Sequence, residues 1–196
     1  MKKSTITLLI VGVFILMLVG GTLTTYNGLV AKEEAVATAW GNIQSQYQRR
    51  TDLIPNLVSI VKGYAKHESE TLESVVAARA KATKITVDAD NLTPEKLKEF
   101  QKAQGELSQA LGRLMVIKEN YPQLKANENF SELQAQLEGT ENRINESRQL
   151  YNSAVQTYNV SVRRFPANIV AGMFGFDKKA QFEAESGAEK APKIDF

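Results

Sequence analysis

The side chains that most enzymes use for nucleophilic, redox or metal chemistry are nearly absent from this sequence. The chain has 196 residues, with no Cys and a single His, His67. A disulfide, an iron–sulfur cluster, a thiolate zinc site and a catalytic Cys are therefore excluded, as is any multi-His metal site. A Ser-His-Asp triad would have to use His67. We predict that the protein is not an enzyme and that it uses no cofactor.

His67 is a poor candidate for a metal ligand. A di-iron site of the ferritin type needs two copies of a Glu-x-x-His pair on one helical face. Position 64 is Tyr, and the sequence holds no second His. We expect His67 to be solvated or to cap the end of a helix, and we predict no metal site.

Carboxylates that could act as a general acid and base occur in two acidic stretches, but no spacing singles out a pair. They are Glu68, Glu70, Glu73, Glu138, Glu141 and Glu146. Such residues usually lie on the solvated face of a helix. Gly172-x-x-Gly175 is not a phosphate loop, because no Gly-Lys-Ser/Thr follows it. The sequence therefore predicts no catalytic residues and no cofactor-binding residues.

Two Tyr-Asn pairs, Tyr151-Asn152 and Tyr158-Asn159, repeat at an interval of seven residues. In a helix the two asparagines share one stripe, two turns apart. Two interpretations are open. The tyrosines are core residues whose hydroxyls reach the edge of a bundle, or the asparagine stripe binds an extended peptide or a neighbouring helix.

Composition and charge exclude further classes of protein. Hydrophobic residues make up 43% of the chain and charged residues 23%, a globular balance that rules out a wholly disordered chain. The 24 Lys and Arg against 22 Asp and Glu give a net charge of +2. A dedicated nucleic-acid binder shows a concentrated basic face instead. We therefore expect no nucleic-acid partner.

The N-terminal region carries a membrane segment. Residues 4–31 contain no charge, and residues 6–23 are almost continuously apolar. A helix over residues 5–25 would be about 31 Å long at ~1.5 Å per residue, which matches the hydrocarbon core of a bilayer. The segment is either a cleaved signal peptide or a retained signal anchor. The anchor is favoured, because the apolar stretch exceeds a usual signal peptide and no A-x-A motif follows it.

The flanking charges predict the orientation of this segment. Lys2 and Lys3 precede it, whereas Lys32 follows it with Glu33 and Glu34 at its side. The positive-inside rule then places the N-terminus in the cytoplasm. We expect a single-pass protein of the cytoplasmic (inner) membrane whose soluble domain lies outside the cytoplasm.

Three long runs with heptad periodicity follow the membrane segment. We call the residues at the repeating positions of each run its seam. The seam of the first run holds Val36, Trp40, Ile43, Tyr47, Arg50, Ile54, Leu57, Val61 and Tyr64. The seam of the second run holds Leu97, Phe100, Gln104, Leu107, Leu111, Leu114 and Tyr121, and that of the third run holds Phe130, Leu133, Leu137, Thr140, Ile144, Ser147, Tyr151, Ala154, Tyr158, Val162 and Phe165. This spacing is typical of helices packed as in a coiled coil. Thr93 and Pro94 mark the start of the second run. Trp40 is expected to be buried.

Short connections, at 83–93 and 121–127, join these runs. Long amphipathic helices with short connections become antiparallel neighbours. We therefore predict an all-α fold, in which an N-terminal transmembrane helix precedes an antiparallel up-and-down bundle of three to four long helices. The predicted boundaries are 1–25 for the membrane anchor, 26–165 for the helical-bundle domain and 166–196 for a C-terminal strap or tail.

The C-terminal tail is the least regular part of the sequence. Residues 166–176 are apolar without heptad order, and Phe182 is an isolated apolar residue. The tail is either a strap that covers one end of the bundle or an exposed apolar patch for a partner.

Several strings of this sequence resemble the LemA family. They include Tyr26-Asn27-Gly28-Leu29-Val30, Arg49-Arg50-Thr51-Asp52-Leu53-Ile54-Pro55-Asn56-Leu57-Val58, Val61-Lys62-Gly63-Tyr64-Ala65-Lys66-His67-Glu68, Tyr151-Asn152, Tyr158-Asn159 and Phe165-Pro166. The resemblance covers nearly the whole chain. It implies a small bacterial membrane protein with a helical-bundle domain and no established enzymatic activity. A membrane protease or quality-control components of the envelope are the protein partners that it suggests.

Pro55 falls inside the first heptad run, where local rules and the pattern conflict. Proline lacks an N–H, and its ring clashes with the carbonyl of Thr51, at a cost of ~3 kcal/mol or more in a helix interior. A break before Pro55 would normally lose the heptad phase, which runs unbroken here. A kinked but continuous helix is therefore favoured.

Arg50 lies on the apolar seam of that helix and needs a partner for its charge. Asp52 is two residues on, which is the wrong face of a regular helix. The expected partner is a carboxylate or a freed carbonyl of the facing helix, and Glu141 or Glu146, from the third run, is the candidate. The pair is either a structural element that fixes register or a polar site used for binding.

The candidate interaction or buried polar site comprises Arg49, Arg50, Asp52, Asn56, Glu141, Asn152 and Asn159. We predict a non-enzymatic, membrane-anchored helical bundle that acts as an interaction or scaffold module in the bacterial cell envelope. The alternative function is an envelope sensor that binds a ligand or peptide at the bundle end.

Overall fold

The computed structural model describes residues 3–183, and every regular element within that range is a helix. The elements are α1 (Lys3–Tyr64), α2 (Ser69–Lys84), α3 (Pro94–Ile117), α4 (Pro122–Lys125), α5 (Glu128–Arg163) and α6 (Ala167–Phe174), with short 3-10 turns η1 (Ala89–Asn91) and η2 (Lys118–Asn120). The predicted all-α class is confirmed for the described residues. Part of the predicted C-terminal tail, residues 184–196, lies outside them.

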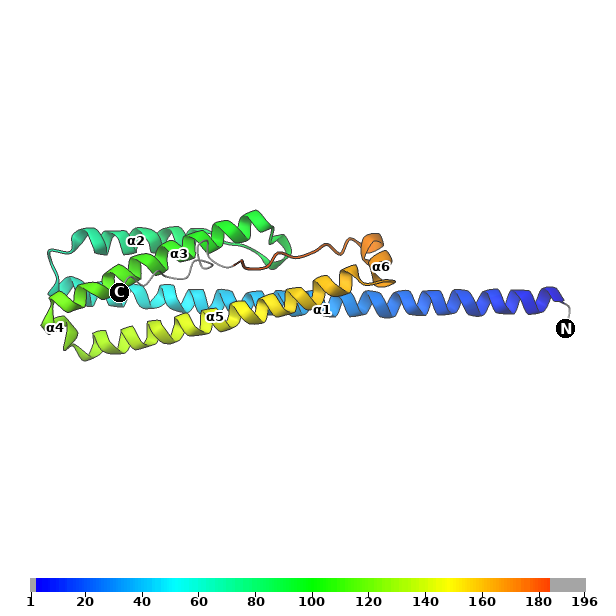
Figure 1. The fold of residues 1–196 in the computed structure, drawn as a ribbon, viewed down its shortest axis with the longest axis horizontal. Helices are drawn as coiled ribbons and strands as arrows, with labels where there is room; N and C mark the ends of the chain where they lie inside the picture. The colour runs from blue at the N-terminus through cyan, green and yellow to red at the C-terminus, as the bar shows by residue number, and fades with distance from the viewer. Residues whose placement is uncertain (1–2, 184–196) are drawn as a thin grey trace, which may run out of the picture.

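The apolar N-terminal segment and the first bundle helix are one continuous helix, α1, of 62 residues. Side chains from Ser4 to Gly21 are all exposed, and regular burial begins at Leu29. Figure 1 shows the N-terminal part of α1 extending beyond the rest of the molecule. Within the described residues, α1 is the one helix that is long and apolar enough to cross a membrane.

α1 continues through Pro55 without a break, as the heptad phase predicted. The structure also shows how the carbonyl that Pro55 leaves without a donor is satisfied. Nε of Arg79, on α2, donates to the carbonyl oxygen of Thr51 at 2.9 Å. A cross-helix bond therefore replaces the missing bond within the helix, which lowers the cost of proline at this position.

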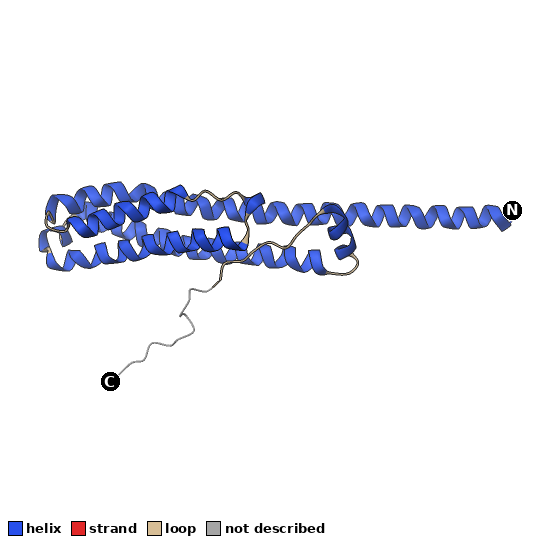
Figure 2. Cartoon of the chain, turned by 90° about the horizontal axis from the view of Figure 1, so that it is seen from above, coloured by secondary structure: helices blue, strands red, loops and turns tan. Residues whose placement is uncertain are grey.

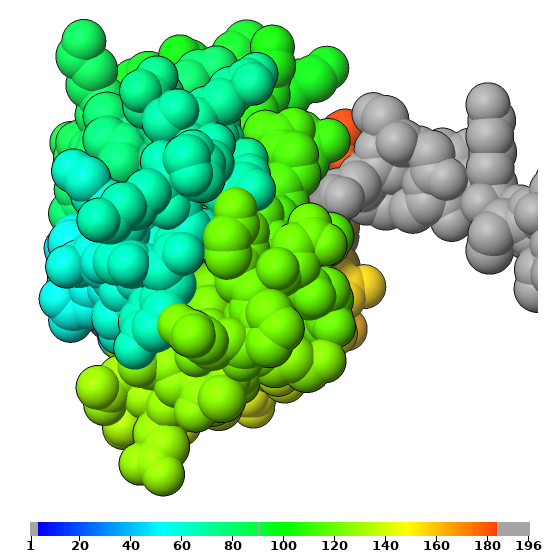
Figure 3. All heavy atoms as spheres, turned by 90° about the vertical axis from the view of Figure 1, so that its left-hand side faces the viewer, coloured from blue at the N-terminus to red at the C-terminus, as the bar shows by residue number. Residues whose placement is uncertain are grey.

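α1 ends at Tyr64, the last seam residue of the first heptad run, and the chain reverses direction at residues 65–68 before α2 begins. Figures 1 and 2 show α5 lying alongside α1 and α2 lying alongside α3. Hydrogen bonds tie the turns together at the end farthest from the membrane segment, which Figure 3 views directly. There Asn127 donates to the Tyr64 hydroxyl at 3.0 Å, and the Tyr121 hydroxyl donates to Glu68 at 3.1 Å.

The core divides into two apolar clusters. The cluster nearer the membrane segment is built around Trp40, which is 1% exposed. The Trp40 ring meets Phe100 edge-on at 5.3 Å, and its Nε1 donates to the carbonyl of Val87 at 2.9 Å. The second cluster, around Leu57 and Leu107, fills the far half of the bundle. The seam assigned to Trp40 is therefore the packed face of α1.

The chain after α5 forms α6 and then an extended segment. α6 packs on α1 and α5 through Val170 and Ala171, and Gly175, with φ of 76°, ends it. We refer to residues 177–183 as the strap. The strap follows the flank of the bundle between α5 and α3, where Gln101 donates to the carbonyl of Glu183. In the described part of the tail, α6 thus lies at the end of the bundle where α1 leaves it, and the strap continues along a side of the bundle.

Candidate functional site

Arg50 is the centre of a buried polar network that joins three helices. Its side chain is 2% exposed. Nη1 donates to Glu141 Oε2 on α5 at 2.9 Å and to Ser108 Oγ on α3 at 2.7 Å. Nη2 donates to Gln104 Oε1 on α3 at 2.6 Å, and the Tyr47 ring lies 5.1 Å from the guanidinium carbon. The charge expected from the sequence is therefore compensated from α1, α3 and α5 together.

Glu141 and not Glu146 is the carboxylate on Arg50. The pairing is asymmetric, because the Glu141 side chain is 45% exposed whereas Arg50 is buried. The buried half of the network consists of neutral groups, of which Gln104 is the most enclosed. Sequence reasoning did not identify Gln104 as a partner, although a polar residue on an apolar seam was a usable signal. The arrangement suits a register-fixing contact.

Three of the predicted site residues lie away from this network. Arg49, Asp52 and Asn56 are exposed on α1, and Asp52 accepts a hydrogen bond from Gln48 Nε2 at 2.7 Å. The structure therefore brings Arg50 and Glu141 together and leaves Arg49, Asp52 and Asn56 at the surface.

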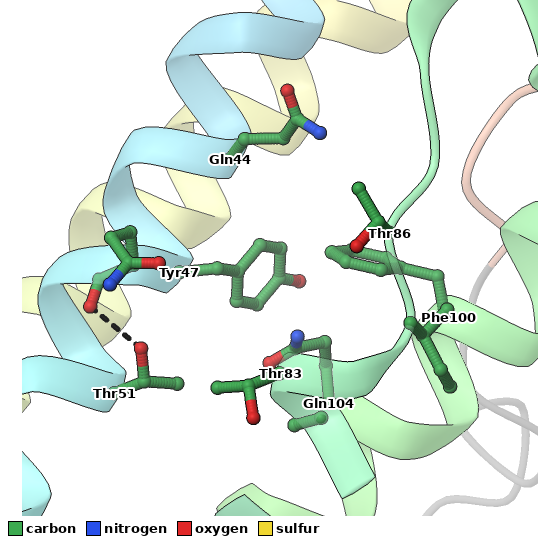
Figure 4. Close-up of a pocket in the computed structure, with 10 residues that line it drawn as sticks. Gln44, Tyr47, Thr51, Thr83, Thr86, Phe100 and Gln104 are labelled. Carbon is green, nitrogen blue, oxygen red and sulfur yellow. Dashed lines mark hydrogen bonds between the residues drawn. The ribbon is translucent and has the colours of Figure 1, made fainter. Parts of the chain in front are cut away.

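A small cavity adjoins the arginine network (Figure 4). Its volume is about 140 Å³, and Tyr47 and Gln104 line it together with Thr51, Thr83 and Thr86. Pockets for small organic ligands are usually ~300–1,000 Å³. The labelled lining side chains are hydroxyls, amides and rings, with no carboxylate or imidazole to transfer a proton. The cavity has neither the size nor the groups of a catalytic site.

His67 is exposed, just beyond the end of α1. Among the side chains that the structure describes, no group of His, Asp and Glu is arranged to hold a metal ion.

Asn152 and Asn159, which we call the asparagine ladder, hold the main chain of the strap. Asn152 Nδ2 donates to the carbonyl of Phe182 at 3.0 Å, and the Phe182 N–H donates back to Asn152 Oδ1 at 2.9 Å. Asn159 makes the same pair of bonds with Lys179, each at 2.9 Å. Each asparagine side chain thus bonds both the backbone N–H and the backbone carbonyl of one strap residue.

The two asparagines can hold one extended segment because seven helical residues rise by the same length that three extended residues span. Seven residues of helix rise about 10.5 Å, and three residues of extended chain span about 10 Å. Asparagines at positions 152 and 159 therefore meet strap residues 182 and 179. The strap runs antiparallel to α5, and the Tyr151 hydroxyl adds a bond to the carbonyl of Ala180 at 2.9 Å.

Both interpretations of the Tyr-Asn repeat describe part of this arrangement. Tyr151 and Tyr158 are buried core residues, and the asparagine stripe holds an extended peptide, which here is part of the same chain. The pKa of Tyr158 is raised to about 12, chiefly by burial and also by the nearby carboxylates of Glu33 and Asp177.

Two strap side chains add contacts that depend on residue type. Phe182 stacks on Trp40 with centroids 6.1 Å apart, and the Arg148 guanidinium carbon lies 4.8 Å from the Phe182 ring centroid. Lys179 Nζ lies 2.7 Å from Glu33 Oε1. The ladder therefore bonds main-chain groups, which every residue type carries. The side chains beside it bind a cation at position 179 and an aromatic ring at position 182.

Comparisons with known proteins identify the family of this chain. The sequence profile described as the LemA family matches residues 39–196. The chain belongs to the LemA family. The match begins just before Trp40 and includes the arginine network, the ladder and the strap, so the features described above lie within the family's own domain.

The relatives of this LemA-family chain are bacterial. Magnetosome protein MamQ 2 of Paramagnetospirillum magneticum is 30% identical over 190 residues, covering 88% of this chain and 69% of that protein. Protein LemA of Metamycoplasma hominis is 26% identical over 177 residues, covering 90% of this chain and 75% of that protein. Neither name denotes an enzyme, and this chain, with its apolar N-terminal helix, is a membrane-associated member of the family.

Proposed function

We propose that this protein is a non-enzymatic interaction module of the bacterial cell envelope, in which a single-pass anchor carries an antiparallel four-helix bundle that binds other proteins. The observation that carries the proposal is the asparagine ladder. Main-chain hydrogen bonds supply affinity for an extended peptide, and side-chain pockets supply specificity. The flank of α5 offers the main-chain bonds, and Arg148 and Tyr151 of the same helix contact the Phe182 ring.

The arginine network has a supporting role in this proposal. Arg50 ties α1 to α3 and α5 and keeps the bundle in one register. A rigid bundle presents the ladder in a fixed geometry, which lowers the entropic cost of binding a partner. Arg49, Asp52 and Asn56 form an exposed polar strip on α1 that supplies a further contact surface for a scaffold.

The proposed location is the cytoplasmic membrane, with the bundle outside the cytoplasm. Lys2 and Lys3 outweigh the single Lys32 flank, which supports this orientation. Alkaline phosphatase and a cytoplasm-only reporter, fused separately after Phe196, test it. Activity of the phosphatase fusion alone is expected, and activity of the cytoplasmic reporter alone would reverse the orientation.

Isolation of the tagged full-length protein from detergent-solubilised cells tests the interaction role. The comparison is between wild type, the ladder variant Asn152→Ala/Asn159→Ala, and Asn142→Ala as a control on an exposed position of the same helix. We expect a stoichiometric partner, such as a membrane protease or a quality-control component, with wild type and Asn142→Ala and its loss with the ladder variant. A partner retained equally by all three would remove the ladder from the proposal.

A peptide sensor is the second candidate, and the tethered strap favours it specifically. A strap that fills its own groove competes with any peptide added in trans, because a short tether gives a high effective concentration. Full-length protein carrying Phe182→Ala has a weakened strap. It should bind a labelled peptide of the sequence of residues 177–183 more tightly than wild type does. Equal binding to wild type, to this variant and to the ladder variant would exclude a sensor at this site.

A further inference from the structure

Large apolar side chains that face solvent gather at one place on the bundle. Beyond residue 30, the exposed large hydrophobic residues in the described part of the chain are Tyr64, Val76, Val116, Leu150, Val160, Phe165, Ile169, Met173 and Phe174. Four of these nine lie between residues 165 and 174, in α6 and the turn before it. Phe165 is 78% exposed and Met173 is 72% exposed. A patch of this kind marks an interaction surface.

α6 lies where α1 leaves the bundle toward its apolar segment, as Figures 1 and 2 both show. The Tyr26 ring contacts Phe174 edge-on at 5.0 Å and Phe176 at 5.5 Å. Tyr26 follows the last residue of the apolar stretch, Leu23, by three positions. At ~1.5 Å per residue, the contact with α6 is about 4.5 Å beyond the end of that stretch.

This distance places α6 in the headgroup layer of the bilayer that α1 enters. A bilayer is ~40–45 Å thick with its headgroups and ~30 Å thick without them, so each headgroup layer spans about 5–8 Å. Thr22, Thr24 and Thr25, at the same level of α1, each donate their hydroxyl to a carbonyl four residues earlier. Such internal bonds allow a hydroxyl to remain in a region with little water.

The residues that flank α6 complement phospholipid headgroups. Arg163 and Arg164 precede the helix, Asp177 and Lys178 follow it, and all four are exposed, so the flanks carry a net positive charge. Basic side chains on both sides of an apolar surface helix are the pattern of segments that lie in a membrane interface. Val170 and Ala171 hold the opposite face of α6 on the bundle, so the helix cannot withdraw its exposed face from the bilayer.

We infer that α6, with Phe165, Ile169, Met173 and Phe174, is a second membrane-binding element that inserts its exposed face into the interfacial region of the bilayer crossed by α1. The partner of this surface is the phospholipid bilayer itself. The inference rests on the membrane insertion of α1 and is independent of the asparagine ladder.

The absence of cysteine from the chain makes the test direct. Full-length protein with Met173→Cys is labelled with an environment-sensitive fluorophore and reconstituted into vesicles of phosphatidylethanolamine and phosphatidylglycerol. Val116→Cys is the matched control, because Val116 is 68% exposed on α3 at the far part of the bundle. Leu16→Cys reports separately whether α1 is in the membrane.

We expect the label at 173 to emit at shorter wavelength than the label at 116, to be quenched by spin-labelled lipid and to be protected from aqueous iodide. With the additional substitution Ile169→Glu, the label at 173 should emit at longer wavelength and become accessible to aqueous iodide. If Leu16 is quenched by lipid and 173 behaves like 116, the inference is wrong. If 173 is protected from both quenchers, a protein covers the face and the bilayer is not its partner. If Leu16 itself is not quenched by lipid, the insertion of α1 fails and the inference fails with it.

Discussion

The contribution of the asparagine ladder to the stability of the strap follows from four hydrogen bonds. The double substitution Asn152→Ala/Asn159→Ala removes the paired bonds to Phe182 and Lys179. A protein hydrogen bond contributes about 1 kcal/mol net, so the four together contribute about 4 kcal/mol. Since ~1.4 kcal/mol is a factor of ten in an equilibrium constant, the open population of the strap should rise about 10²–10³-fold.

Trypsin provides the assay, because the strap contains Lys178 and Lys179. When opening is fast relative to cleavage, the cleavage rate follows the population of the open form. Fragments ending at these two lysines, quantified by mass spectrometry over time, should therefore appear two to three orders of magnitude faster in the double variant. Each single substitution removes two bonds and should accelerate cleavage about thirty-fold.

Asn142→Ala is the matched control, because Asn142 is an exposed asparagine on the same helix. It should be cleaved at the wild-type rate. Far-UV circular dichroism checks that the double variant keeps its helices. Unchanged cleavage at Lys178 and Lys179 in a helical double variant would mean that the contacts of Phe182 hold the strap without the ladder.

Three further predictions concern the core. Trp40→Ala should lower the free energy of unfolding by ~3–5 kcal/mol in a denaturant titration, whereas Tyr64→Ala, at an exposed seam position, should cost far less. Arg50→Leu should cost ~1–3 kcal/mol, because Gln104 Oε1 loses its donor while Glu141 stays hydrated; a double-mutant cycle with Gln104→Leu should recover most of the loss. Wild type should lose stability as the pH rises from 10 to 12, since an unfolded tyrosine ionises near 10.0 and Tyr158 only at about 12. Tyr158→Phe should reduce that slope and leave the part that comes from Tyr151, whose pKa burial also raises. It should leave stability at neutral pH unchanged, because the Tyr158 hydroxyl has no hydrogen-bond partner in the described structure.

The heptad seam could be predicted from sequence because burial on a helix is periodic. Every first-run seam residue from Val36 to Val61 is buried, Arg50 included. Tyr64 is the exception, because α1 ends at this residue and its hydroxyl turns to Asn127 at the bundle end. The seam also placed the charge of Arg50 in the interior. A buried charge needs a partner on a facing helix, and Glu141 is that partner.

Contacts between segments without periodicity could not be predicted in the same way. Arg79 has no sequence feature that points to the carbonyl of Thr51, since the bond depends on how α2 packs beside Pro55. The strap has no hydrophobic period, and only its docked position shows why Lys179 and Phe182 matter. The Tyr-Asn repeat was the one local signal for the ladder, and it could not identify the peptide that the asparagines hold.

The continuity of α1 sets the height at which the protein can meet its partners. At ~1.5 Å per residue, the 62 residues of α1 form a rod about 93 Å long. If the bilayer surface lies near Thr25, Trp40 stands about 22 Å above it and Tyr64 about 58 Å above it. The strap packs against Trp40, so it lies in the lower half of the part of α1 that stands above the bilayer. It is within reach of the extended segments that neighbouring membrane proteins carry next to their own anchors, while the far end of the bundle stands clear of the membrane.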